Sequence, residues 1–158
     1  MKVDKYIIFW LNLSIVIVFL MIFIGGITRL TDSGLSMTEW RPITGVLPPL
    51  NQLEWQNSFD LYKNFPEYKH YNMNMTLSEF KLIYFWEYVH RLLGRLIGIL
   101  FIIPFAFFYS KNYFNRQYLY KFFFLFILGG LQGLMGWYMV KSGLVNNPDI
   151  SHLRLSVH

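Results

Sequence analysis

The chain has 158 residues, of which 54% are hydrophobic and only 15% are charged, a balance typical of a protein that crosses a membrane several times. It contains no cysteine, which excludes disulfides, thiolate metal sites and cysteine nucleophiles. The formal net charge is +5, but basic residues in a membrane protein report orientation first, so we expect no nucleic-acid partner.

The hydropathy pattern predicts an all-α, polytopic membrane protein. Apolar runs of spanning length occupy about residues 7–27, 82–109 and 122–140, and a fourth span is expected to begin at about residue 148. The first run is longer than the apolar core of a signal peptide and no small-residue cleavage site follows it, so we interpret it as a retained span. Because no transit peptide precedes it, we expect a bacterial inner membrane rather than a mitochondrion.

The distribution of charge predicts the orientation of these spans. The short connection 110–121 carries Lys111, Arg116 and Lys121 and no acidic residue, whereas the long segment 28–81 has five basic and six acidic residues. The positive-inside rule therefore places the N-terminus and the short connection in the cytoplasm and the segment 28–81 outside.

The segment 28–81 carries too much aromatic surface for a free linker. Within it, Trp55, Phe59 and Tyr62 recur at helical spacing, which predicts a short amphipathic helix at about residues 52–64 on the outer surface. An interfacial aromatic belt without a further role is the alternative interpretation. Thr76 and Glu79 have the spacing of a capping box and predict the start of the second long helix.

Four ionisable residues interrupt the second apolar run, namely Glu87, His90, Arg91 and Arg95. A charged side chain near the bilayer centre costs about 2.5–3.5 kcal/mol, so these groups should face a bundle interior, a ligand or an interface. Their spacing places them near one helix face. Gly94 and Gly98 leave room beside His90, which suits a porphyrin with histidine on its iron and arginine near its propionates. A glycine-mediated helix contact, with arginines that snorkel or pair with Glu87, is the alternative.

The third span is rich in small residues. Gly129, Gly133 and Gly136 recur at helical spacing, which predicts close packing against a neighbouring helix or a cofactor. Pro148 then follows Asn147, a pair that suits the first turn of a fourth helix.

A second histidine lies at the end of the chain. His158 follows the start of the fourth span by about as many residues as His90 follows the start of the second, so on parallel helices both imidazoles reach about 12 Å below the outer boundary. This is the geometry of bis-imidazole haem ligation, and Arg154 stands one turn from His158. His152 lies nearer the surface and about 120° away around the helix, so we treat it as secondary. No role is assigned to His70.

Three stretches resemble one known family. The sequence GGITRLTDSGLSMTEWRPITGVLPP at residues 25–49 closely resembles the first-loop signature of haem A synthases. The sequence EYVHRLLGR at residues 87–95 is similar to that family's second-helix motif, and HLRLSVH at residues 152–158 to the opening of its fourth helix. The absence of a loop cysteine pair is typical of the cysteine-free type found in proteobacteria and mitochondria.

This resemblance implies an N-terminal four-helix bundle over residues 1–158, truncated at the start of its fourth span, with an extracytoplasmic loop at residues 28–81. It implies an inner-membrane oxidoreductase that converts haem O to haem A by oxidising a porphyrin methyl group to formyl. Carried over by position, His90 and His158 are axial ligands of the substrate haem iron, and Glu87 is a catalytic carboxylate. We expect Arg91, Arg95 and Arg154 to be the partners of the haem propionates or of a carboxylate.

The same resemblance predicts the partners. These are haem O and haem A, the lipid bilayer, haem O synthase, and either a C-terminal half that holds haem b or a second copy of the chain. Because the fourth span lacks its body, we expect a fragment or one piece of a split protein that is not competent alone. A bis-histidine haem b electron-transfer protein and a haem-free structural bundle are the alternatives.

Overall fold

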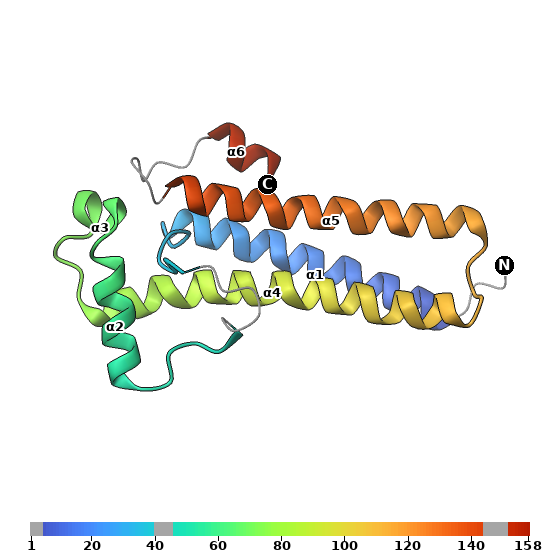
Figure 1. Cartoon of the computed structure of the whole chain (residues 1–158), viewed down its shortest axis with the longest axis horizontal. Coiled ribbons are helices and arrows are strands. Elements are labelled where there is room, and N and C mark those ends of the chain that lie inside the picture. The colour runs from blue at the N-terminus through green and yellow to red at the C-terminus, as the bar shows by residue number, and fades with distance from the viewer. Residues whose placement is uncertain (1–4, 40–45, 144–151) are drawn as a thin grey trace.

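The computed structural model of the chain describes residues 5–39, 46–143 and 152–158, and this described part is helical with connecting turns. Three long helices, α1 (Lys5–Leu30), α4 (Leu77–Ser110) and α5 (Arg116–Gly143), run along the longest axis of the molecule (Figure 1). Two short helices, α2 (Gln52–Tyr62) and α3 (Pro66–Tyr71), gather at the end where α4 begins. The short helix α6 (His152–Val157) lies against α5.

The three long helices coincide with the predicted spans, and each is by length and composition apolar enough to cross a membrane. They extend beyond the predicted apolar runs at both ends. The 34 residues of α4 make it about 51 Å long, whereas the hydrocarbon core is about 30 Å thick, so its ends reach the aqueous boundary. The predicted helix start at Pro148 lies outside the described residues.

At one end of the molecule, α1, α4 and α5 meet in an aromatic cluster. Its buried members are Ile7, Trp10, Phe108 and Phe122. The indole Nε1–H of Trp10 donates a 2.8 Å hydrogen bond to the backbone carbonyl of Leu100. Pro104 stands four residues later in α4 and has no N–H, so this carbonyl has no intrahelical donor and Trp10 supplies one.

The other end is covered by α2 and α3, which with the start of α4 we call the outer cap. Its core contains Phe59, Tyr62 and Phe80, with the rings of Phe59 and Phe80 stacked 5.0 Å apart. The side chain of Asn51 caps α2, and Thr76 with Glu79 forms the predicted capping box at the start of α4. The predicted amphipathic helix therefore corresponds to α2, whereas α3 was not predicted.

The arrangement agrees with one part of the predicted topology. The start of α1 and the connection between α4 and α5 lie at the same end of the molecule, and the outer cap lies at the opposite end (Figure 1). Segments predicted to share the cytoplasmic side are therefore together. Which end faces the cytoplasm stays a prediction.

The long helices differ in how far they are covered. α1 packs mainly along α4, whereas α5 touches α4 at fewer positions. Exposed apolar side chains of α5 include Phe123, Phe124, Leu125, Phe126, Ile127, Leu128, Leu131 and Leu134. Such a surface suits lipid or a further protein element.

Candidate functional site

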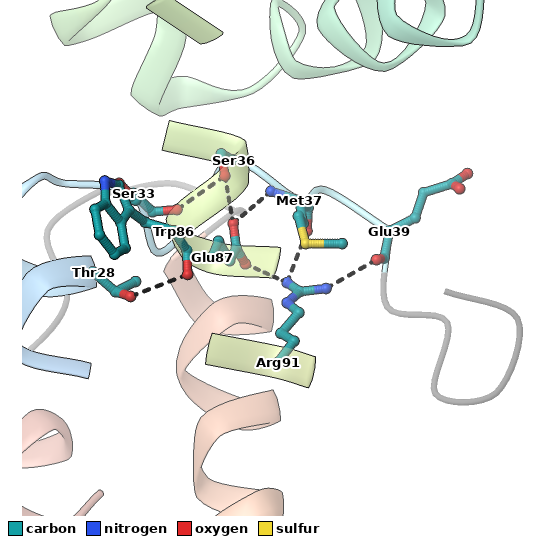
Figure 2. A network of polar contacts seen from close by, with 8 residues as sticks. All are labelled: Thr28, Ser33, Ser36, Met37, Glu39, Trp86, Glu87 and Arg91. Carbon is teal, nitrogen blue, oxygen red and sulfur yellow. Dashed lines mark hydrogen bonds and ion pairs between the residues drawn. The ribbon is translucent and has the colours of Figure 1, made fainter. Parts of the chain in front are cut away.

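The carboxylate of Glu87 is the centre of a polar network between α4 and the first loop (Figure 2). Only 2% of this residue is exposed. The hydroxyl of Ser36 donates to its Oε2 at 2.7 Å, and the backbone N–H of Met37 donates to the same oxygen at 2.6 Å. Its Oε1 accepts a 2.5 Å bond from Arg91 one turn further along the helix, a pairing that belonged to the alternative interpretation of this segment.

Arg91 extends this network along the loop. Its Nη2 donates to the backbone carbonyl of Met37 at 2.9 Å, and its Nη1 donates to the carbonyl of Glu39 at 3.1 Å. Three hydrogen bonds thus engage the guanidinium with the loop and with Glu87. The planar fork of an arginine fits such a set of acceptors, whereas a lysine ammonium does not.

A helix C-cap brings the loop to this position. Asp32 has a left-handed backbone with φ 48°, which lets the chain turn sharply after α1. The N–H of Ser33 donates to the carbonyl of Thr28 at 3.0 Å, and that of Asp32 to Arg29, the pattern of a Schellman motif. The turn folds the next residues back onto α4, where Leu35 and Ser36 are almost fully buried.

The two predicted haem ligands lie close together. The ring centroids of His90 on α4 and His158 after α6 are 6.1 Å apart, with the ring planes at 56°. Two metal–imidazole bonds of about 2.0–2.1 Å, plus half the width of each ring, give a centroid separation of about 6 Å. The observed centroid separation is close to this value.

The glycines near these rings have different surroundings. A Cβ on Gly94 would lie 3.6 Å from the methyl group of Met21, so a side chain of α1 occupies the space expected there for a porphyrin. Gly98 has no atom within 4 Å of such a Cβ, and the same holds for Gly129 and Gly133 in the described part of the chain. The close packing predicted for the third span is found at Gly136, where the neighbour is His158.

The other predicted site residues are dispersed. Arg154 donates to the hydroxyl of Ser142 and lies 5.0 Å from the ring of Tyr138, so it faces α5. Arg95 is partly buried one turn beyond Arg91. His70 is exposed on α3, and the side chain of His152 lies outside the described part.

Ser36 and Met37 are site residues that the sequence analysis did not single out. Both lie in the loop signature, but nothing in their residue types marks them as partners of a carboxylate 50 or more positions away. The sequence feature that could have pointed to them is the loop signature at residues 25–49, because its polar and small residues are unusual beside an apolar span.

The sequence was compared with known proteins. The pattern of a family described as cytochrome oxidase assembly protein matches residues 8–158. The haem A synthase of Rickettsia canadensis is 54% identical over 149 residues, which cover 94% of this chain and 44% of that protein. Those of Flavobacterium psychrophilum and Nitrosospira multiformis are 51% and 53% identical, over 100% and 99% of this chain and 47% and 44% of theirs. No solved structure matches.

The chain spans about half the length of the curated relatives it matches, and it aligns with their N-terminal part. The stretches at residues 25–49, 87–95 and 152–158 all lie inside the matched range. The chain therefore belongs to the cytochrome oxidase assembly protein family, in agreement with the resemblance to haem A synthases that these stretches carry.

Proposed function

We propose that this chain forms the substrate-haem half of a haem A synthase, an oxidoreductase that oxidises a methyl group of haem O to the formyl group of haem A. The observation that carries the proposal is the 6.1 Å separation of the His90 and His158 rings in a chain of this family. His90 lies on α4 and His158 follows α6, far along the sequence, so their approach is a property of the tertiary structure.

In this proposal His90 and His158 would hold the iron of haem O. The Nδ1 of His158 lies 3.1 Å from the carbonyl of Gln132, and an Nδ1–H donated there leaves Nε2 as the free ligand atom. Oxidation of a methyl group to formyl adds one oxygen atom and removes four electrons, which pass to an electron acceptor outside this chain, while the protein binds and orients the haem.

Glu87 is the proposed catalytic carboxylate. It precedes His90 by one turn on α4, and three hydrogen bonds engage its oxygens. An ionised carboxylate has about four acceptor sites, so one is left for a proton or a substrate group. Among the arginines, Arg91 serves this carboxylate directly, and Arg95 and Arg154 are the proposed partners of the haem propionates.

The proposal also includes the membrane, the orientation and the partners of the protein. We place the protein in a bacterial inner membrane with its N-terminus in the cytoplasm, because the basic connection 110–121 favours that side. Its proposed partners are haem O synthase as the source of substrate, and either a C-terminal half that carries haem b or a second copy.

The test is to express the chain in cells that make haem O, with and without the C-terminal half of a haem A synthase, and to analyse extracted haem by mass and pyridine haemochrome spectra. Haem A only when both halves are present supports the proposal, and loss of haem A in a His90→Ala version identifies the site. Haem b alone in every combination contradicts it and supports a bis-histidine electron-transfer protein.

A further inference from the structure

Each imidazole of the site rests against a glycine of a neighbouring helix. A Cβ built on Gly25 of α1 would lie 3.2 Å from Cε1 of His90 and 3.5 Å from its Nδ1. A Cβ on Gly136 of α5 would lie 2.8 Å from Cε1 of His158 and 3.3 Å from its Nε2. A Cβ at position 136 would force a shift of the His158 ring, whereas with a Cβ at position 25 the His90 ring would have to give by a few tenths of an ångström.

These contacts are specific to two glycines. Gly26 is the direct neighbour of Gly25, and Gly133 lies one turn from Gly136, yet a Cβ on either meets no atom within 4 Å in the described part of the chain. Successive helix positions point about 100° apart, so only one of two adjacent glycines can face the histidine. General helix packing therefore does not account for the pattern.

The two imidazole rings also differ in the hydrogen bonding of their Nδ1 atoms. His158 has the hydrogen-bonding distance of 3.1 Å from its Nδ1 to the Gln132 carbonyl. The Nδ1 of His90 is buried and has no hydrogen-bond partner within the part of the chain that the structure describes. The His90 ring therefore lies against Gly25 and the His158 ring without a hydrogen bond to its Nδ1 in the described part, whereas His158 has both a glycine and a carbonyl.

We propose that Gly25 and Gly136 are positioning residues that seat the two imidazoles and set their separation for binding one iron between them. The inference rests on the proposed function, because it requires a haem between His90 and His158. Metal–ligand distances tolerate a shift of about 0.2 Å. A real Cβ essentially never approaches within 3.0 Å, so alanine at position 136 must displace the His158 ring by at least about 0.2 Å, which reaches that tolerance, and alanine at 25 presses the His90 ring less strongly.

The test compares four alanine variants of the whole chain in detergent, each titrated with ferric protohaem. Gly25→Ala and Gly136→Ala are the test variants, while Gly26→Ala and Gly133→Ala put the same methyl group on the same two helices. Absorption and electron paramagnetic resonance report the low-spin state that two axial imidazoles impose. We expect the wild type and both controls to give the low-spin spectrum, and Gly136→Ala to lose it with about a 10-fold or greater loss of haem affinity.

The outcomes separate the two proposals. If the wild-type chain takes up no low-spin haem, the proposed function fails and the inference fails with it. If the wild type does so and both test variants behave like their controls, the inference alone is wrong.

A further pair of variants separates ring positioning from a folding defect. In His158→Ala with free imidazole added, the untethered ligand can shift, so Gly136→Ala should then cost much less haem affinity than it does when His158 is present. A full loss in that background would show that Gly136→Ala disrupts the helix and would overturn the role proposed here.

Discussion

Glu87 and Arg91 illustrate how one pair of residues can serve both folding and chemistry. Their ion pair is nearly excluded from solvent, and both groups also bind the first loop. Leaving one member of a buried pair alone costs about 3–5 kcal/mol, so substitution of either residue threatens the loop as well as any reaction. A test of the catalytic role must therefore separate these two effects.

We predict that Glu87→Ala, in a protein completed by its C-terminal half, abolishes haem A formation while bound haem is retained. General acid–base catalysis contributes at least about 10²-fold, so the yield of haem A should fall by that factor or more. The measurement is the ratio of haem A to total haem after extraction. An unchanged ratio would contradict a catalytic role for this carboxylate.

The matched control is Ser36→Ala, which removes one hydrogen bond to the same oxygen and leaves the carboxylate in place. A bond to a charged group contributes about 1.5–3 kcal/mol, so this variant should loosen the loop but keep most haem A formation. Arg91→Lys should also loosen the loop and keep most haem A formation. Its positive charge remains, but the guanidinium that donates to the carbonyls of Met37 and Glu39 is lost. Equal losses in all three variants would assign Glu87 a purely structural role.

At the scale of elements, the outer cap contains a buried polar group that the proposed reaction does not use. Glu67 on α3 is 7% exposed, and the hydroxyl of Tyr62 donates to its carboxylate at 2.9 Å. Asn72 donates to that hydroxyl in turn at 2.7 Å. Burial is the main cause that raises the pKa of the Glu67 carboxyl to about 7, and the negative charge of Glu87 adds to it.

We therefore predict that the outer cap is more stable in acid than at neutral pH. A carboxyl whose pKa rises from 4.5 to about 7 on folding binds its proton more tightly when folded, so its contribution is complete below pH 4.5. That contribution is lost as the pH rises to about 7. At about 1.4 kcal/mol for each pKa unit, the loss is about 3 kcal/mol at most.

Hydrogen exchange of α2 and α3 in detergent at several pH values measures this effect. Glu67→Gln keeps the shape of the side chain without its charge, so it should remove the dependence between pH 4.5 and 7 and leave protection higher than in the wild type at pH 8. Protection that rises with pH in the wild type would contradict the prediction.

The helices, turns and contacts of the structure show which features the sequence could predict. The three spans, the amphipathic helix and the capping box were predictable because they follow from local periodicity and from pairs three or four residues apart. The short α3, the turn at Asp32 and the loop contacts with Glu87 were not, because they depend on which distant groups meet. His90 and His158 were paired by equal depth, whereas the glycines that seat them required coordinates.

At the scale of the whole molecule, the ends differ in charge. Lys111, Arg116 and Lys121 lie around the connection between α4 and α5, opposite the outer cap with its nearly balanced charges. Because basic residues remain on the cytoplasmic side during insertion, we predict that this asymmetry orients the bundle. In that orientation we expect the site at Glu87 and His90 to lie in the outer half of the membrane, below the cap.

We predict that the outer cap is extracytoplasmic, and the absence of cysteine makes this simple to test. Asn74→Cys just before α4 and Gln117→Cys at the start of α5 each replace an exposed neutral residue. A membrane-impermeant maleimide should label Asn74→Cys in intact spheroplasts and Gln117→Cys only after lysis. The opposite pattern would contradict the orientation.

Changing Lys111, Arg116 and Lys121 to glutamine removes the basic bias of the connection between α4 and α5. If these three charges set the topology, this change should raise the fraction of Gln117→Cys that is labelled before lysis.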